Sequence, residues 1–432
     1  MSFDAPESAN YAATIVKLPQ GLLLEGLDNL VGVPMFGYQA LTQKEGYELG
    51  ALRVLFMAET QLDADYAREN NLFREATLNR DASETGYLEP NARVKALRLR
   101  KHQSDALLMP LSSLAYTGYD VSTLKPGDTF DKLNGHTICR KYVAKGKKQA
   151  TQGQPKVRKQ VDERLFPKHL DTEHLFRNLH YFRDPKHEVV TQKLHGTSWR
   201  GGNIPVNRDK GWFERVVVNK WLRIATPDAE YQHRYGSRNV VKGRSENNHF
   251  YKSDLWAKFG EKLEGKIPEN FMIYGELIGW VSEDEPIQRG YTYDLPPGQC
   301  ELYVYRVATV NPKGVIADLS WEGVKDFCRT LELKTVPQLW SGFRWVPSGE
   351  GEEYAIREYS DNYLDIRLAE APDAGEFDES PVPLSDRKTV DEGVCVRIEG
   401  QIPRVFKAKS PKFLEHETKQ LDKGEVDLES VA

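Results

Sequence analysis

The feature that most constrains the fold is a basic stretch that divides the chain at residues 144–160. It reads AKGKKQATQGQPKVRKQ, with Val157 as its one large apolar residue and no acid. Such a composition is typical of a flexible linker that could follow a phosphate backbone, or of a plain solvated loop. A 432-residue chain fits two or three domains. We therefore expect separate domains at residues 1–143 and 161–432.

The part before the basic stretch is rich in short strand patterns separated by turns. Gly46 lies between the second and third of these patterns, which suits a hairpin. About five short strands in a segment of this length suggest a small β-barrel of the OB type, with another small β-fold as the alternative. The expected strands are residues 12–18, 37–42, 50–57, 92–99 and 136–142.

The part after the basic stretch has longer strand patterns interrupted by helical ones. Residues 321–333 carry apolar side chains at near-helical spacing ahead of Pro337. This mixture predicts an α+β domain with antiparallel sheets. The expected strands are residues 188–193, 271–280, 301–310, 393–399 and 404–408.

Composition indicates a soluble cytoplasmic protein, which we expect to be a monomer. Hydrophobic residues make up 39% and charged residues 28% of the chain, and no run approaches the roughly eighteen apolar residues of a membrane helix. The four cysteines form no CxxC pair, so neither a zinc site nor a disulfide framework is expected. Because the net charge is −5, any nucleic acid must be bound by local basic surfaces.

The strongest chemical motif is TQKLHGTSW, residues 191–199. An apolar strand ends at Lys193, and Gly196 permits a tight turn three residues later. This places a lysine amine at the edge of a pocket, where nearby cations or partial burial could lower its pKa and make it a nucleophile. By itself the motif is weak, since solvated lysines at strand ends are common.

Three later segments strengthen the interpretation. In FMIYGELIGW, an apolar strand runs into Gly275 and Glu276; in DEGVCVRIEG, Glu392 precedes another strand. In RVFKAKSPKF, Lys407 and Lys409 are two residues apart, so both ammonium groups project from one face of a strand. A lysine nucleophile, two carboxylates and paired lysines are the groups that phosphoryl transfer from ATP requires.

The order of these segments resembles the covalent nucleotidyltransferase superfamily of polynucleotide ligases and capping enzymes. The superfamily's motifs are K-x-[DH]-G, a glutamate strand, an aromatic strand, E-G-[VY]-[VC]-x-[RK] and K-x-K. With histidine as its third residue, KLHG resembles the motif of RNA ligases, whereas DNA ligases and capping enzymes usually have aspartate at that position. The N-terminal segments YAATIVKLP, ENNLFR and HTICRKY resemble RNA ligase family five, the Deinococcus-type enzymes. That family places an OB domain before the nucleotidyltransferase (ATP-grasp-like ligase) domain.

The resemblance implies roles for individual residues, with ATP and Mg²⁺ or Mn²⁺ as cofactors. Lys193 would accept AMP, and Glu392 would be a carboxylate of the metal site or of the phosphate pocket. Tyr305 would stack on adenine, with Tyr303 as the alternative. Arg306 stands where many relatives have aspartate, so no metal role is assigned to it. The nucleotide-binding set would be His195, Gly196, Arg238, Glu276, Tyr305, Lys407 and Lys409.

Nucleic-acid binding is expected from the N-terminal domain, whereas the nucleotide chemistry lies between Lys193 and Lys409. We therefore expect the first domain to be dispensable for building the AMP pocket. The partner would be RNA or an RNA-containing nicked duplex. The basic residues expected to contact it are Arg93, Lys95, Arg98, Arg100 and Lys101.

These features predict an ATP-dependent RNA ligase that joins a 5′-phosphate end to a 3′-OH end. A capping guanylyltransferase normally carries its OB domain after the paired lysines, but few residues follow Lys409 here. A DNA ligase is disfavoured by His195. An OB-type single-strand binder without activity would require the lysines and carboxylates to be accidental.

Overall fold

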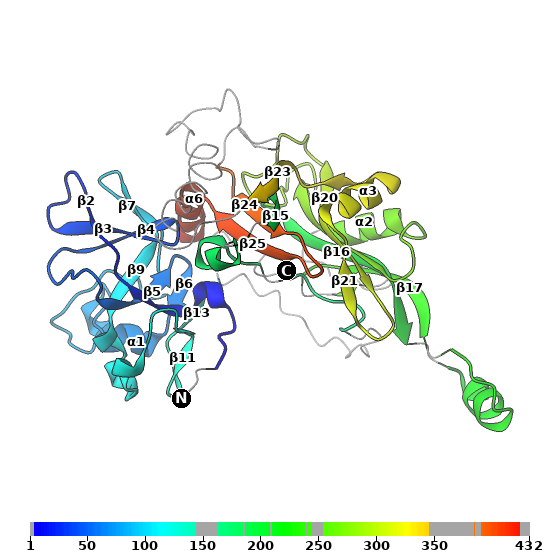
Figure 1. Cartoon of the computed structure of the whole chain (residues 1–432), viewed down its shortest axis with the longest axis horizontal. Helices are drawn as coiled ribbons and strands as arrows, with labels where there is room; N and C mark the ends of the chain where they lie inside the picture. The colour runs from blue at the N-terminus through cyan, green and yellow to red at the C-terminus, as the bar shows by residue number, and fades with distance from the viewer. Residues whose placement is uncertain are drawn as a thin grey trace.

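The structure is a computed structural model with two lobes (Figure 1). It describes residues 4–143, 163–170, 172–182, 184, 186–207, 210–227, 229–238, 241–242, 254–344, 384 and 390–423. The predicted linker at residues 144–160 lies outside the described residues. The architecture is mixed α+β with mostly antiparallel sheets, as the sequence predicted.

The N-terminal lobe contains a four-stranded antiparallel sheet in the order β10-β1-β5-β9. Its apolar core includes Ile15, Val54 and Phe56, all fully buried. Beside it lie a three-stranded sheet, β2-β3-β4, and three strand pairs, β6 with β13, β7 with β8 and β11 with β12. The strands of the two larger sheets are β1 (Ala13–Lys17), β2 (Leu22–Leu23), β3 (Leu30–Met35), β4 (Tyr38–Gln43), β5 (Leu52–Met57), β9 (Ala106–Pro110) and β10 (Thr129–Phe130). The pairs are β6 (Thr60–Leu62), β7 (Leu97–Leu99), β8 (His102–Ser104), β11 (Lys132–Leu133), β12 (His136–Thr137) and β13 (Cys139–Lys141), and one short helix is α1 (Ala64–Glu69).

Two expectations about this lobe are not met. No sheet among the described residues closes into a barrel, because β9 and β10 are the two edges of the four-stranded sheet. The hairpin expected around Gly46 is wrong, since β4 pairs with β3 whereas β5 pairs with β1 and β9. The tight turn lies instead at Phe36 and Gly37, which both have positive φ and connect β3 to β4.

The C-terminal lobe is built on two larger sheets. The first has the order β14-β25-β24-β15-β23. The second runs β18-β17-β16-β19-β20-β21, with the short β22 paired in parallel to β20. The first sheet consists of β14 (Glu173–His174), β15 (Lys186–Lys193), β23 (Gln338–Arg344), β24 (Gly393–Ile398) and β25 (Arg404–Lys409). The second consists of β16 (Thr197–Asn207), β17 (Ala229–Gly236), β18 (Val241–Lys242), β19 (Phe271–Gly279), β20 (Cys300–Val310), β21 (Ile316–Asp318) and β22 (Lys334–Thr335).

The largest apolar core joins these two sheets. It combines Val189 of β15 with Trp199 of β16 and Leu277 of β19. Two helices, α2 (Leu255–Leu263) and α3 (Trp321–Thr330), add their buried faces, and α3 confirms the helix predicted from apolar spacing. No described helix is long and apolar enough to cross a membrane.

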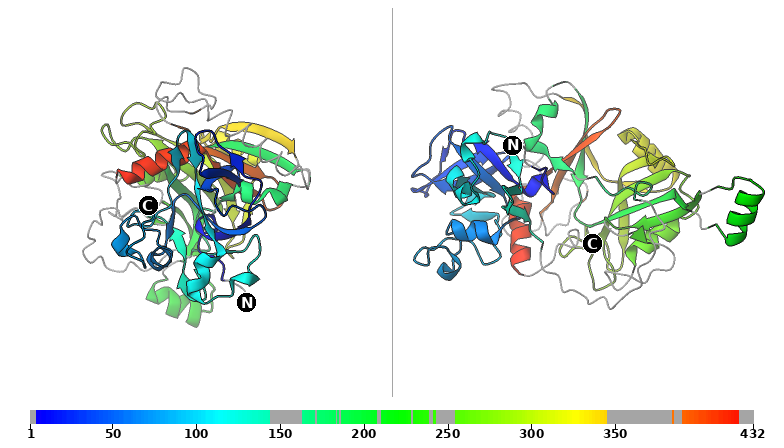
Figure 2. Two further views of the ribbon diagram at one scale, coloured as in Figure 1. Left: turned by 90° about the vertical axis from the view of Figure 1, so that its left-hand side faces the viewer. Right: turned by 90° about the horizontal axis from the view of Figure 1, so that it is seen from below.

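Two further features stand out in Figures 1 and 2. Helix α6 (Pro411–Asp422) follows β25 directly and lies between the two lobes. The β16–β17 hairpin carries a projecting arm, residues 210–227, with the π-helical segment η7 (Glu214–Trp221) at its end. The arm extends well away from the rest of the chain.

Candidate nucleotide site

Strand pairing brings two predicted lysines to one edge of the five-stranded sheet. Lys193, the last residue of β15, pairs with Gly393 at the start of β24. Gly393 in turn pairs with Lys409 at the end of β25. The three residues thus form one row across adjacent strands, although the chain separates the lysines widely. Gly393 has φ +147°, and a Cβ there would lie 2.0 Å from the carbonyl oxygen of Ala408, so the close pairing requires glycine.

Glu392 lies between the two lysines and is fully buried. Its Oε2 is 2.7 Å from Lys193 Nζ, and its Oε1 is 3.6 Å from Lys409 Nζ. Burial alone would raise the pKa of this carboxyl, but Lys193, His195 and Lys409 together hold it well below its usual value. Glu392 is therefore a carboxylate that keeps two ammonium groups close together.

The turn after Lys193 is fixed by backbone contacts. The Gly196 N–H donates to Glu276 Oε1 at 3.2 Å, and a Cβ on Gly196 would lie 2.1 Å from the Leu277 carbonyl oxygen. The His195 N–H donates to Tyr293 Oη at 2.6 Å. The His195 ring lies edge-on to Tyr291, with centroids 4.7 Å apart. His195 and Gly196 thus hold the turn in place, and neither of them lines the cavity that opens beside Lys193.

A cavity of about 840 Å³ opens in front of this row. Tyr305 is part of its wall and contacts His169 through its hydroxyl, whereas Tyr303 is not part of the wall and its hydroxyl donates to Glu301 at 2.7 Å. The β19–β20 pairing has an irregularity at this point, because Tyr274 lies opposite Arg306 whereas Gly275 lies opposite Val304. Tyr305 is therefore the extra residue of β20, and Tyr303 keeps a regular position opposite Glu276. The predicted residues that line the cavity are Lys193, Arg238, Glu276, Tyr305, Lys407 and Lys409.

The strands that form this site lie in a region of the chain that resembles known proteins. The family model described as RNA ligase matches residues 186–409, which runs from the first residue of β15 to Lys409. The chain belongs to the RNA ligase family. No curated protein was found to match the sequence.

Solved structures extend the likeness beyond the family segment. Naegleria gruberi RNA ligase with PPi is 16% identical to the chain, with a TM-score of 0.58 over 94% of this chain and 98% of the other. A mutant of that enzyme with AMP and Mn gives the same values. A mutant with ATP and Mn gives 16% identity and a TM-score of 0.57 over 95% and 99% of the two chains. At this identity the likeness establishes a shared fold across both lobes.

The cavity of this RNA ligase family member is not confined to the C-terminal lobe. Tyr11, Glu59 and Lys141 of the N-terminal lobe also line it. The motifs placed the AMP pocket between Lys193 and Lys409, and they gave no indication that residues of the first lobe line the same cavity. Strand and spacing patterns cannot reveal such a contact, because it depends on how the lobes dock.

The five basic residues expected to bind nucleic acid do not form one surface. Arg93 is only 1% exposed and donates to Glu59 and Asp422, so a phosphate backbone cannot reach it. Lys95 pairs with Asp422 at 2.8 Å, and Arg98 with Glu415 at 2.8 Å. Both carboxylates belong to α6. Arg98, Arg100 and Lys101 are all exposed along the β7–β8 hairpin, although Arg98 is engaged by Glu415.

The structure adds residues that no sequence motif indicated. Glu417 on α6 accepts from Lys409 Nζ at 3.0 and 3.1 Å. Gln288 donates to the Gly196 carbonyl at 2.8 Å, and Tyr291 donates to the Val390 carbonyl at 2.8 Å. The helical pattern after Pro411 could have predicted α6, but not the direction in which Glu417 points.

Proposed function

We propose that this chain is an ATP-dependent RNA ligase that attaches AMP to Lys193 and then uses it to seal RNA. The observation that carries the proposal is the row of Lys193, Gly393 and Lys409, with the buried Glu392 carboxylate between the two lysines and a cavity in front of them. Membership of the RNA ligase family and the fold shared with an enzyme solved with ATP and Mn support it.

The first step would join Lys193 to AMP. The deprotonated Nζ attacks the α-phosphorus of ATP, a P–N bond forms, and the P–O bond to pyrophosphate breaks. Lys409, beside the nucleophile, and Lys407, two residues before it on β25, would stabilise charge on the phosphate oxygens. Tyr305 would stack on adenine, and Glu276, which accepts from the Gly196 N–H, would contact the ribose. Arg238 at the cavity wall would contact phosphate.

Two further transfers would complete sealing. A 5′-phosphate oxygen of RNA attacks the phosphorus of lysyl-AMP, the P–N bond breaks, and Lys193 recovers its proton. A 3′-OH then attacks that 5′-phosphate, forming the phosphodiester and releasing AMP. Glu392 would keep the regenerated Lys193 ammonium in place between transfers, since the two groups are 2.7 Å apart.

The described residues suit a divalent cation held mainly by substrate. No group of three or more His, Cys, Asp or Glu side chains among them could hold a metal alone. Mg²⁺ is commonly bound by one or two carboxylates together with substrate phosphates and water, and Glu392 would supply such a carboxylate. The cation, Mg²⁺ or Mn²⁺, would neutralise phosphate charge.

We further assign the chain to the Deinococcus-type family five, with residues 1–143 and 161–432 as its domains, acting as a monomer in the cytoplasm. Its substrate would be a nicked duplex with a ribonucleotide at the 3′-OH. The N-terminal segments similar to family five support this assignment, and the exposed Arg100 and Lys101 offer part of a phosphate contact.

The deciding experiment is intact mass spectrometry of the full chain after incubation with each nucleoside triphosphate and Mg²⁺ or Mn²⁺. An AMP adduct that maps to Lys193 is expected with ATP alone. A GMP adduct would point to a capping-type enzyme, and no adduct with any nucleotide would overturn the proposal. Nicked duplexes with RNA or DNA at the 3′-OH then measure substrate preference.

A further inference from the structure

Lys409 is held chiefly from outside its own sheet. Its Nζ lies 3.0 and 3.1 Å from the two carboxylate oxygens of Glu417 on α6, nearer than the 3.6 Å to Glu392. The same ammonium lies 5.0 Å from the centre of the Phe413 ring, also on α6. The position of this helix therefore fixes the position of the lysine.

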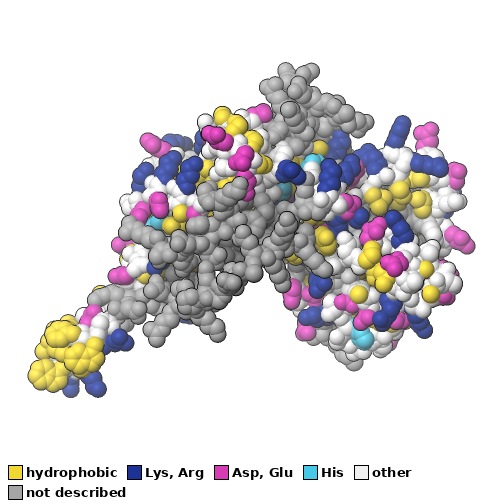
Figure 3. Space-filling view, turned by 180° about the vertical axis from the view of Figure 1, so that it is seen from behind, with side chains coloured by type: hydrophobic (Ala, Val, Ile, Leu, Met, Phe, Trp, Pro, Cys, Tyr) yellow, Lys and Arg dark blue, Asp and Glu magenta, His cyan; other side chains and the backbone are white. Residues whose placement is uncertain are grey.

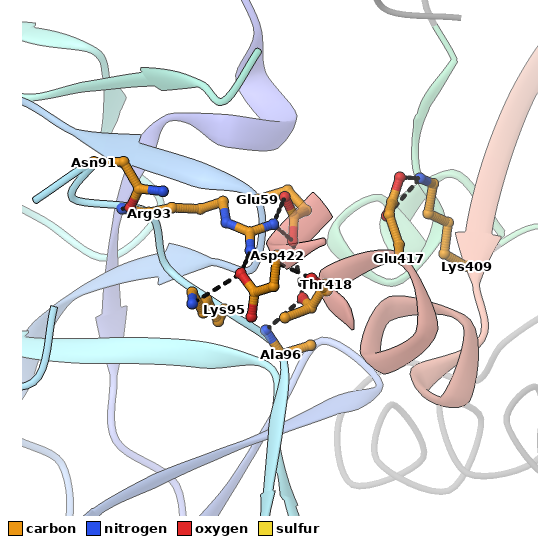
Figure 4. Close-up of polar contacts among 9 residues, drawn as sticks. All are labelled: Glu59, Asn91, Arg93, Lys95, Ala96, Lys409, Glu417, Thr418 and Asp422. Carbon is orange, nitrogen blue, oxygen red and sulfur yellow. Dashed lines mark hydrogen bonds and ion pairs between the residues drawn. The ribbon is translucent and has the colours of Figure 1, made fainter. Parts of the chain in front are cut away.

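Helix α6 is in turn attached to the N-terminal lobe (Figure 4). The Thr418 hydroxyl donates to Glu59 at 2.9 Å and accepts from the Ala96 N–H at 3.1 Å. Arg93 bridges Glu59 and Asp422 from the N-terminal side. Glu59, Arg93 and Thr418 are each no more than 5% exposed, so the contacts among these three residues are buried. The Asp422 side chain is 43% exposed.

Adjacent positions on the helix thus face different lobes. Glu417 points toward Lys409, whereas Thr418 points toward Glu59, as expected for neighbours about 100° apart around a helix axis. Asp422, four residues after Thr418, shares its face. Burial and the charge of Glu417 raise the pKa of Glu59 to about 7, against the lowering effect of Arg93 and of the Thr418 hydrogen bond.

We propose that Glu417 is a positioning residue for Lys409, and that the N-terminal lobe sets this position by docking α6 through Thr418, Glu59 and Arg93. The lobe would then contribute to the adenylylation step as well as to RNA binding. This inference rests on the proposed function for its effect on rate, but the position of Lys409 can be measured without any nucleotide.

A matched pair of substitutions at Thr418 tests the docking. Thr418→Val removes the hydroxyl at nearly constant volume, whereas Thr418→Ser keeps it. Misplacement of a catalytic group by about 1 Å can cost about 10²-fold in rate. We expect Thr418→Val and Glu417→Gln to slow Lys193 adenylylation 10- to 100-fold, with little change in the KM for ATP. Thr418→Ser and Lys419→Gln, a control at an exposed position of α6, should remain close to wild type.

Chemical labelling of the Lys409 amine tests the position of this side chain without relying on its role in catalysis. Lys409 should react faster with an amine-acetylating reagent in Glu417→Gln and Thr418→Val than in wild type, as read by peptide mass spectrometry. Equal labelling in Thr418→Val and Thr418→Ser, or wild-type adenylylation in Glu417→Gln, would overturn the proposal. If wild type forms no AMP adduct, the proposed function fails while labelling still decides the role of Glu417.

The projecting arm supports a second, independent inference. Its exposed rings are Trp212, Phe213 and Trp221, which are 71%, 64% and 81% exposed. Figure 3 shows hydrophobic side chains gathered at its tip, with basic side chains beside them. Residues 210–227 contain four lysines and arginines and one acid, in a chain of net charge −5. Aromatic faces combined with local positive charge match the bases and phosphates of RNA.

The arm also lies on the same hairpin as a cavity residue. β17 leads from the arm toward Arg238, and its eight residues span about 26 Å. We propose that the arm binds RNA that extends from the joining site, through stacking on Trp212 and Trp221 and contacts with Arg215, Lys220 and Arg223. This inference rests on the proposed RNA substrate.

Nicked duplexes of different flank length test this placement in the full chain. The double variant Trp212→Ala, Trp221→Ala should raise the KM at least tenfold for nicked duplexes that have a long flank on one side of the nick. It should leave the sealing of duplexes with short flanks, and the adenylylation of Lys193 by ATP, unchanged. The exposed Phe343→Ala, outside the arm, is the matched control. Equal KM changes for short and long flanks would overturn the inference. So would unchanged RNA binding accompanied by loss of vesicle binding or of self-association.

Discussion

At the scale of single residues, Lys193 forms an ion pair with Glu392, whose side chain is fully buried. Lys193→Ala should abolish the AMP adduct and lower the free energy of unfolding by about 1–3 kcal/mol, because Glu392 loses its nearest cation. Lys193→Arg should also form no adduct, since arginine cannot give up its proton, but it should be more stable than the alanine variant. Intact mass and urea unfolding measure the two effects, and an AMP adduct in either variant would contradict the assignment.

The lowered pKa of Glu392 predicts a specific dependence of stability on pH. A carboxyl whose folded pKa lies below its unfolded value near 4.5 stabilises the fold fully above about pH 4.5. That stabilisation declines as the pH falls further. The difference in unfolding free energy between wild type and Glu392→Gln should therefore be constant from pH 8 to 5 and shrink below pH 4.5. A difference that grows on acidification would contradict the ionised state of Glu392.

Motif spacing identified several of the residues that line the cavity, because Lys193, Glu276 and Lys409 each lie on or at the end of a recognisable strand. It gave no indication of the wall residues that come from the N-terminal lobe. It failed for Arg93, since a basic residue in a strand-like pattern is normally exposed. Here the side chain is buried by a helix more than three hundred residues later. No local pattern carries that information.

At the scale of elements, the β24–β25 pairing depends on a glycine. Gly393→Ala should separate the start of β24 from the end of β25 and displace Lys409, because its Cβ would meet the Ala408 oxygen. We expect a loss of about 2–4 kcal/mol in unfolding free energy and adenylylation reduced by about 10²-fold. Gly400→Ala is the control, since its nearest contact is 3.9 Å away. Similar behaviour of the two variants would mean that the pairing tolerates a side chain.

The long strands of the C-terminal lobe were predictable, as β19 and β20 show, because their buried faces give extended apolar runs. The pairing of short N-terminal strands was not. β4 and β5 are separated by a turn-like segment with Gly46, yet they enter different sheets. Partners such as β1 and β9 for β5 come from distant parts of the chain, where local turn chemistry gives no guidance.

At the scale of the whole molecule, the two lobes share one cavity. A chain beginning at residue 163 should therefore adenylylate Lys193 much more slowly than the full chain, contrary to what motif spacing suggests. It loses both the wall that includes Lys141 and the docking partners of α6. Adding residues 1–143 as a separate polypeptide, with folding checked by circular dichroism, should restore part of the rate. A wild-type rate for the isolated lobe would contradict this view.

The place of α6 in the chain also has a consequence for synthesis in the cell. Every motif residue from Lys193 to Lys409 leaves the ribosome before the helix that carries Glu417. A nascent chain therefore holds the nucleophile, the carboxylates and both paired lysines while Lys409 still lacks its main anchor. If damage to the messenger RNA stopped translation within this interval, the truncated protein would contain every motif residue but would adenylylate Lys193 slowly. The ligase would then become fully active only after synthesis has passed α6.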